Sequence, residues 1–247
     1  MGKLHRQIPR FTVKFAEDTA DLTLMKIFVD PISIAKKLKS LIKWKLRNAL
    51  HPFYNLQKKK DQLELIRICN QKDGQSPFLH VIVVCYKRFG EMKILLQSWI
   101  NQSDQDWVMT IIHDGQSTEF DQIVQEYKSI SSGKIMSFST NIRYDDYGHT
   151  LRSLGLECSA AKYTLITNGD NYFIPKTVQY LKEKYMSFLL EEYKIDMSSA
   201  IVKTEISRAV GINSIDHGAD QQYYSDIRNS CHEIREAKVN RVLLVHN

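Results

Sequence analysis

Apolar segments of strand length alternate with segments of helical period over the middle of the chain, and this alternation limits the possible folds more than any other feature. FLHVIVVCY, at Phe78–Tyr86, is a continuous run of mainly apolar residues, which is typical of a strand covered on both faces. Similar runs lie at Trp107–Asp114, Lys134–Ser139 and Tyr163–Thr167. Helical spacing lies between them, at Glu91–Asn101, Phe120–Ile130 and Thr150–Ala161. The order predicts an α/β fold, a mostly parallel sheet with helices on both faces.

Basic residues are concentrated in the first third of the chain. Residues 1–77 hold 16 Lys and Arg against 7 Asp and Glu, whereas the remaining residues hold 18 against 21. A lysine run at Lys58–Lys60, followed by polar residues up to Pro77, is typical of a helix and then a linker. The sequence therefore predicts a basic, partly helical N-terminal extension over residues 1–77 and a compact domain over residues 78–247.

The segment Ser33–Leu50 has apolar residues near helical spacing, with lysines and an arginine elsewhere around the helix. Pro31 and Ser33 favour a start, and His51-Pro52 favours a stop. Such a helix either packs its apolar face on the domain or lies on an anionic membrane surface, where each basic side chain contributes on the order of 1 kcal/mol. Both alternatives stay open for residues 33–50, and nucleic acid is not an expected partner.

The cysteines and the hydropathy pattern limit the cellular location. Four cysteines, at Cys69, Cys85, Cys158 and Cys231, are widely spaced without a CxxC pair, which argues against a zinc site and favours a reducing compartment. No apolar run approaches the roughly 18 residues that a membrane span needs. We therefore expect a cytoplasmic protein, with peripheral contact to a membrane as the accompanying hypothesis.

Polar and charged residues follow three of the predicted strands. They are Tyr86-Lys87-Arg88, Asp114-Gly115-Gln116-Ser117 and Asn168-Gly169-Asp170-Asn171. In parallel sheets of this kind, ligands bind at the carboxyl ends of the strands. We expect these three segments to meet at one edge of the sheet.

The order of these motifs resembles family 2 nucleotide-sugar glycosyltransferases of the GT-A fold, over about Phe78–Tyr180. The residues that carry the resemblance are Tyr86, Arg88, Leu95, Leu96, Ser98, Gln102, Asp114, Gly115, Ser117, Gly148, Arg152, Gly155, Ala160 or Ala161, Asn168, Asp170 and Pro175. The resemblance implies a Rossmann-like GT-A enzyme, a glycosyltransferase that moves a sugar from a nucleotide-diphosphate sugar, expected to be UDP-linked, to an acceptor hydroxyl. Charge on the leaving diphosphate has to be neutralised, which implies Mn²⁺ or Mg²⁺ as the cofactor.

The resembling family binds this cation with an Asp-x-Asp motif, whose first position here is Asn168 and whose second is Asp170. An amide is neutral and a poorer ligand for a hard cation, so we predict that Asp170 binds the metal and that Asn168 contacts ribose or water. An ordinary polar turn is the alternative for these residues. Several GT-A enzymes add a histidine to the metal shell, and His246 is the candidate here, which favours manganese.

Four further residues are predicted to bind the nucleotide sugar. The resemblance matches Asp114 to a carboxylate that binds the base, although an N-cap or a turn before Ser117 is the alternative. Tyr86 is predicted to border the nucleotide. Arg88 and Arg152 are predicted to contact the diphosphate or the donor sugar, because a guanidinium suits planar bidentate contact, and solvated surface arginines are the alternative.

An inverting enzyme also needs a carboxylate that takes the proton of the acceptor hydroxyl. The resemblance places this residue at the start of a helix, well after the metal motif. Asp220, between Gly218-Ala219 and Gln221-Gln222, is the predicted base in preference to Asp216, and an N-cap role for Asp220 is compatible with it.

Two other functional classes stay open. A catalytically inactive GT-A module that binds nucleotide sugars would account for the missing first Asp of the motif. A nucleotidyltransferase would need a Gly-rich loop with Lys or Arg after the first strand, and Tyr86-Lys87-Arg88-Phe89-Gly90 does not match such a loop.

Overall fold

The computed structural model describes residues 50–70, 76–184, 200–214, 218–230 and 244–246. The predicted helix Ser33–Leu50 lies outside these residues except for Leu50. None of the helices in the described ranges is long and apolar enough to cross a membrane.

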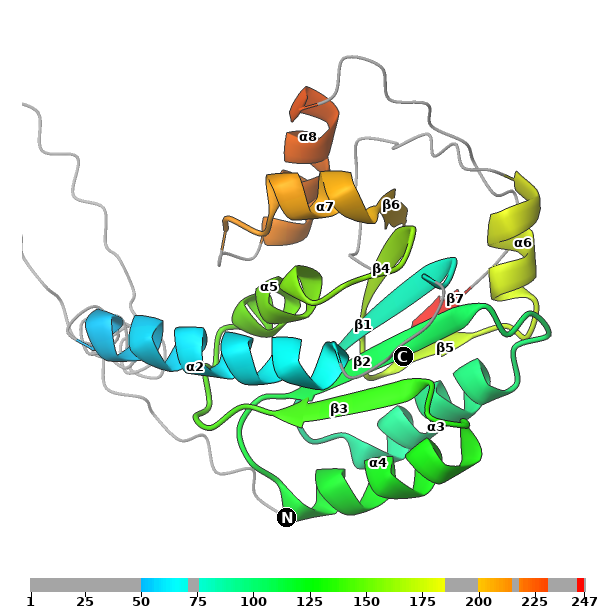
Figure 1. Ribbon diagram of the computed structural model, residues 1–247, viewed down its shortest axis with the longest axis horizontal. Helices are drawn as coiled ribbons and strands as arrows, with labels where there is room; N and C mark the ends of the chain where they lie inside the picture. Colours follow the sequence, from blue (N-terminus) through cyan, green and yellow to red (C-terminus); the bar gives the residue numbers. More distant parts are fainter. Residues whose placement is uncertain (1–49, 71–75, 185–199, 215–217, 231–243, 247) are drawn as a thin grey trace, which may run out of the picture. The chain divides into compact units, whose positions relative to one another are not determined.

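A central sheet of five strands, in the order β3-β2-β1-β4-β6, is formed by the described residues (Figure 1). Its strands are β1 (Leu79–Cys85), β2 (Trp107–His113), β3 (Ile135–Ser139), β4 (Tyr163–Asn168) and β6 (Ile201–Lys203). Strand β1 pairs in parallel with β2 and β4, β2 pairs in parallel with β3, and β6 runs antiparallel to β4. The predicted mostly parallel sheet is confirmed, and β1 is apolar throughout because it is central and covered on both faces.

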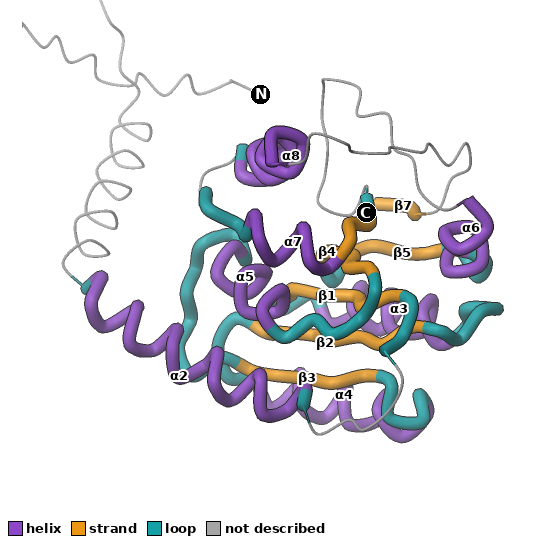
Figure 2. The backbone as a smooth tube through the Cα atoms, turned by 45° about the horizontal axis from the view of Figure 1, so that its top comes forward, coloured by secondary structure: helices purple, strands orange, loops and turns teal. Residues whose placement is uncertain are grey.

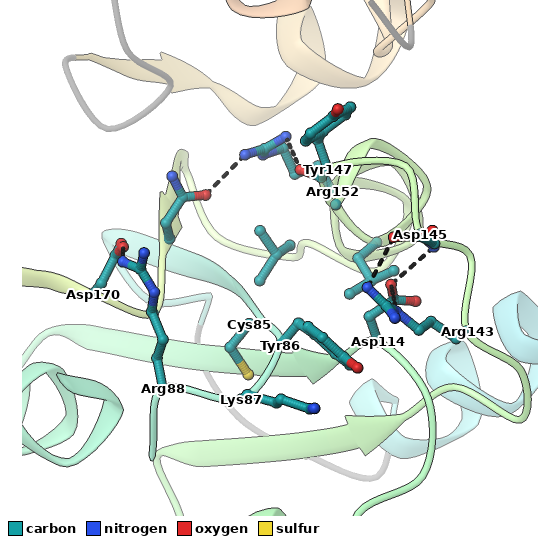
Figure 3. A pocket seen from close by; sticks show the side chains of 15 residues that line it. Cys85, Tyr86, Lys87, Arg88, Asp114, Arg143, Asp145, Tyr147, Arg152 and Asp170 are labelled. Atoms are coloured by element: carbon teal, nitrogen blue, oxygen red, sulfur yellow. Dashed lines mark hydrogen bonds and ion pairs between the residues drawn. The ribbon is translucent and has the colours of Figure 1, made fainter. Parts of the chain in front are cut away.

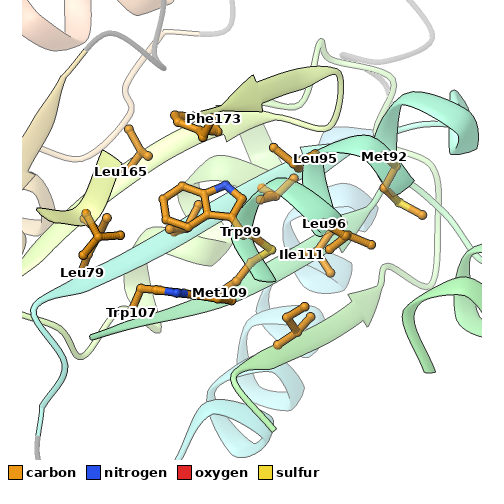
Figure 4. Packing of buried hydrophobic residues seen from close by; sticks show 14 of the residues in the cluster. Leu79, Met92, Leu95, Leu96, Trp99, Trp107, Met109, Ile111, Leu165 and Phe173 are labelled. Atoms are coloured by element: carbon orange, nitrogen blue, oxygen red, sulfur yellow. The ribbon is translucent and has the colours of Figure 1, made fainter. Parts of the chain in front are cut away.

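One face of the sheet is covered by α3 (Phe89–Ile100), α4 (Thr118–Ile130) and α6 (Thr177–Lys184). Side chains of β1 that point to this face, Leu79, Val81 and Val83, are fully buried among residues of these helices. Trp99 of α3 lies at the centre of the cluster, with its ring centroid 5.5 Å from that of Trp107 and 4.9 Å from that of Phe173 (Figure 4). Burial of these aromatic side chains together with the surrounding Leu, Ile, Val and Met side chains stabilises this layer.

The opposite face is covered by α2 (His51–Cys69), α5 (His149–Glu157) and α8 (Ala219–Ser230), with α7 (Thr204–Val210) packed against α5 and α8 (Figure 2). A Cβ atom at Gly155 would lie 2.4 Å from Cγ2 of Ile82. Glycine at this position therefore lets α5 lie directly on β1. The predicted helices on both faces are confirmed.

From Tyr54 onward, helix α2 belongs to the same compact unit as the sheet, a unit that runs from Tyr54 to Asn247. Leu65 of α2 is fully buried against β1, β2, β3 and α5. The sequence placed the start of the domain near Phe78 instead. The difference arises because exposed lysines and leucines interrupt the buried stripe of α2, so that its composition is typical of an extension.

The described residues also form a separate sheet of two strands. Strand β5 (Asn171–Phe173) pairs antiparallel with β7 (Leu244–His246), and Asn171 is opposite His246. The last apolar segment of the sequence is thus a strand beside the residue that follows Asp170.

Candidate functional site

A cavity of about 520 Å³ opens at the carboxyl ends of β1, β2 and β4. The chain runs from β1 outward through β2 to β3 and then returns to β4 on the other side of β1, so the cavity lies where the strand order reverses. Ligands bind at such points in open α/β sheets. Six predicted residues line the cavity, namely Tyr86, Arg88, Asp114, Arg152, Asn168 and Asp170.

The turn after β4 is held close to the end of β1. The backbone N–H of Gly169 donates to the carbonyl of Val84 over 3.0 Å. A Cβ atom at position 169 would lie 2.9 Å from the Cβ of Cys85, closer than such atoms approach in proteins. Glycine is therefore required for Asn168 and Asp170 to reach the cavity on either side of it.

Asp170 forms an ion pair with Arg88 at one side of the cavity (Figure 3). Nη1 of Arg88 lies 2.6 Å from Oδ2 of Asp170, and the side chains are 63% and 16% exposed, respectively. Oδ1 of Asp170 is buried and accepts no hydrogen bond within the described residues. One carboxylate oxygen is thus paired with a solvated arginine, and the other lacks a donor.

Asn168 accepts a hydrogen bond from Arg152 of α5, whose Nη2 lies 2.8 Å from Oδ1 of the amide. Arg152 is buried, at 5% exposure, and its Nη1 donates to the carbonyl of Tyr147 and to Nδ1 of His149. A buried guanidinium at the rim of a cavity favours an anionic ligand there.

Asp114 lies at the other side of the cavity, and its carboxylate is hydrogen-bonded to the backbone of a neighbouring loop. Its carboxylate accepts the backbone N–H of Tyr144 over 2.7 Å and that of Asp145 over 2.9 Å. Burial raises the pKa of Asp114, and the charge of Asp146 adds to this, whereas the two backbone N–H groups and Arg143 act against it. The N-cap role, which was the alternative for Asp114, is not observed, because Ser117 caps α4 through its own side chain.

The loop between β3 and α5 adds residues that the sequence did not predict, among them Arg143, Asp145 and Tyr147. The guanidinium of Arg143 lies over the ring of Tyr86, 3.8 Å from its centroid, and its Nη2 contacts Asp145 over 2.8 Å (Figure 3). Lys87 also lines the cavity. The signal in the sequence is the mixture of charged and aromatic residues in RYDDY, which begins four positions after the end of a strand.

Among the described residues, Asp170 is the one that best fits a divalent cation. Its Oδ1 accepts no hydrogen bond from this part of the chain, and such an oxygen suits a hard cation. The described residues contain no group of three His, Cys, Asp or Glu side chains that could hold a metal ion. His246 is described by its backbone, which β7 places opposite Asn171.

Asp220 does not line the cavity. It lies half-buried in the first turn of α8, a helix that buries Tyr223 and Tyr224 against Ile82 and Ile166. Asp216, the alternative base, lies outside the described residues.

No protein-family model and no curated protein matches the sequence of this chain. Solved structures do match it. S. aureus TarS 1-349 superposes with a TM-score of 0.58 at 13% identity, over 68% of this chain and 59% of that chain. Its complex with UDP-GlcNAc superposes with a TM-score of 0.55 at 13% identity, over 68% and 57%.

The mannosyltransferase PcManGT from Pyrobaculum calidifontis, in complex with GDP-Man and Mn²⁺, superposes with a TM-score of 0.50 at 14% identity, over 74% of this chain and 63% of that chain. The chain thus spans less than two thirds of the length of these structures. Likeness at such identities establishes the fold. The chain has the GT-A fold that the sequence motifs predicted.

Proposed function

We propose that the chain is a glycosyltransferase that moves a sugar from a nucleotide-diphosphate sugar, expected to be UDP-linked, to an acceptor hydroxyl. One observation carries the proposal: the cavity at the reversal of strand order is lined by four cationic side chains, Lys87, Arg88, Arg143 and Arg152. A diphosphate carries concentrated negative charge, and guanidinium groups bind phosphate oxygens in a bidentate manner. The similar structures with UDP-GlcNAc and GDP-Man support this choice of ligand.

The two sides of the cavity suggest how the donor is oriented. We assign the nucleoside to the side of Tyr86 and Asp114, where an aromatic ring and a carboxylate lie together. The diphosphate and sugar are assigned to the side of Arg88, Arg152 and Asn168, where guanidinium groups and an amide oxygen converge. Binding in this orientation would place the bond to the sugar near Asp170.

For the cofactor, we propose that Asp170 holds Mn²⁺ or Mg²⁺ and that His246 of the neighbouring strand is a second ligand. Such a cation supplies positive charge to the leaving diphosphate. The cation would compete with Arg88 for the charge of Asp170, and a released Arg88 would be available to the phosphate oxygens. Its exposure of 63% leaves room for this movement.

As the general base we propose Asp220, which would accept the proton of the acceptor hydroxyl in an inverting reaction. Its position in the first turn of α8, a helix anchored by two buried tyrosines, supports a rigidly held carboxylate. Asp220→Asn is expected to abolish most turnover while the affinity for the donor nucleotide stays within twofold of wild type. Unchanged turnover would remove Asp220 from this role.

The decisive experiment is a calorimetric titration of the full chain with UDP, GDP and their sugar conjugates, with Mn²⁺ and with EDTA. A glycosyltransferase is expected to bind one nucleotide and to hydrolyse the matching nucleotide sugar slowly. Binding without turnover with any acceptor or water would favour the inactive module, for which Asn168 in place of a carboxylate is the specific observation. Absence of nucleotide binding would refute the donor site.

Membrane contact through residues 33–50 stays a proposal, together with a cytoplasmic, peripheral location. Helix α2 supports it, because Leu56 and Leu63 are 56% and 70% exposed and the neighbouring Lys59 and Lys60 are exposed as well. Apolar and basic side chains on one face suit an anionic bilayer surface. Flotation with vesicles containing phosphatidylserine tests this, and the full chain remaining at the bottom of the gradient would contradict it.

A further inference from the structure

The loop that carries Arg143, Asp145 and Tyr147 into the cavity has an uncommon backbone. Asp145 and Tyr147 have φ values of 51° and 58°, in the left-handed region that residues with side chains rarely adopt. Such conformations persist where surrounding contacts over-determine them. The contacts that hold this loop therefore decide the shape of one side of the cavity.

Asp61 of α2 makes several of these contacts, although it does not line the cavity. Its side chain is fully buried, and Oδ2 accepts the hydroxyl of Tyr144 over 2.8 Å. Oδ1 accepts the side-chain amide of Asn141 over 2.8 Å and that of Gln57 over 3.1 Å. A buried carboxylate is costly unless donors surround it, and two of these three donors come from the loop.

Tyr144 is the residue through which this carboxylate acts. Its backbone N–H donates to Asp114 while its hydroxyl donates to Asp61, so two buried carboxylates hold one residue from opposite ends. Burial and the neighbouring Asp61 raise the pKa of the Tyr144 hydroxyl, so it stays protonated and remains a donor. The adjacent Arg143 and Asp145 are thereby fixed in the cavity.

We propose that Asp61 is a positioning residue for the nucleotide pocket, acting through the hydroxyl of Tyr144, and that α2 is therefore a working part of the site. This rests on the proposed function, because the ligand of the pocket is taken to be a nucleotide. The helix that the sequence assigns to an extension then sets the geometry of Arg143 over Tyr86.

Tyr144→Phe is the sharpest test, because it removes the hydroxyl and keeps the ring. Tyr223→Phe is the matched control: it also removes a buried, hydrogen-bonded hydroxyl, which contacts Ser207, and it does not line the cavity. Loss of a buried hydrogen bond that positions the loop is expected to weaken the affinity for UDP or GDP by about tenfold in Tyr144→Phe, while Tyr223→Phe stays within twofold. Thermal unfolding checks that both variants are folded at the temperature of titration.

Asp61→Asn is expected to weaken nucleotide binding as well, and the double variant with Tyr144→Phe should be no weaker than the worse single variant. Hydrogen exchange of the peptide that covers residues 141–148 is measured in parallel without nucleotide. Faster exchange there in Tyr144→Phe, and not in Tyr223→Phe, is expected. Wild-type exchange and wild-type affinity in Tyr144→Phe would overturn the inference.

The exchange measurement also separates the two proposals. If the wild-type chain binds neither UDP nor GDP, the proposed function fails, while faster exchange at residues 141–148 would still show that Asp61 and Tyr144 hold the loop. If the wild-type chain binds a nucleotide and Tyr144→Phe binds it equally well, the positioning role fails and the proposed function stands.

Discussion

Asp114 and Asp170 are carboxylates of the same cavity, and they differ in what binds them. Asp114 accepts two backbone N–H groups of a neighbouring loop, and its side chain is 8% exposed. Asp170 is paired with one long side chain that is 63% exposed. The two N–H partners of Asp114 cannot leave unless the loop moves, whereas Arg88 can rotate away at little cost. The side of the cavity at Asp114 is therefore held in one conformation, whereas at the side of Asp170 the partner of the carboxylate can be exchanged.

Asp170→Asn tests the exchangeable side and has the largest expected effect. If Asp170 holds the cation, as we propose, removing its charge is expected to lower turnover at least about 100-fold. Stability should change by less than about 0.5 kcal/mol, because ion pairs with exposed partners contribute little. Steady-state kinetics and urea unfolding measure the two quantities. A large loss of stability would mean that Asp170 is as structural as Asp114.

Asp114→Ala tests the fixed side. It leaves the N–H groups of Tyr144 and Asp145 without their acceptor, which is expected to lower the free energy of unfolding by about 2 kcal/mol. Asp145→Asn is the control, since that side chain is 43% exposed, asparagine tolerates the left-handed backbone at this position, and loss of the charge should cost less than about 0.5 kcal/mol. Equal unfolding midpoints in urea for Asp114→Ala and wild type would remove the distinction between the two sides.

Arg88→Met sharpens the comparison with a smaller effect. Without its guanidinium, Asp170 is available to a cation, so Mn²⁺ is expected to bind up to about fivefold more tightly in the absence of nucleotide. Free Mn²⁺, followed by electron paramagnetic resonance, gives this affinity without any turnover. Arg143→Met is the control that should leave it unchanged. Weaker Mn²⁺ binding in Arg88→Met would mean that Arg88 does not compete for Asp170.

The pH dependence of stability gives the smallest effect. The pKa of Asp114 is raised in the folded chain, so the native state holds a proton that the unfolded state releases. Its contribution is complete below the ordinary pKa of 3.8 and is lost as the pH rises through the raised value. The difference in unfolding free energy between wild type and Asp114→Asn should therefore fall over this window. A rise would mean that Arg143 and the two N–H groups outweigh burial and Asp146.

The strands and the edge where the cavity lies were predictable, because strand period and parallel order determine which residues meet. Tyr86, Asp114 and Asp170 lie within two residues of the end of a strand, so their convergence needs only the topology. Arg143 and Tyr147 were not predictable in the same way. Their loop has no period, and it reaches the cavity through left-handed backbone and through contacts with Asp61, which lies about 80 positions earlier in the chain. A lone Asp in a lysine-rich helix gives no sign that it is buried.

The roles of Asp220 and His246 and the membrane contact of residues 33–50 remain predictions. The role of Asp220 depends on the acceptor substrate, and the role of His246 depends on the geometry of its side chain. Membrane contact depends on a lipid surface. The fold, by contrast, follows from the arrangement of buried strands alone.

Gly169 fixes the backbone of the turn after β4, whereas the charge of the turn depends on its neighbours. The close approach to Cys85 forbids a side chain at position 169, so the path of the turn is invariant. The neighbouring Asn168 is one base change from aspartate. Such a change would leave the backbone as it is and would give the turn a second carboxylate, beside Asp170, that faces Arg152. The charge of the turn can therefore change by substitution at position 168, while its backbone conformation, which depends on Gly169, stays the same.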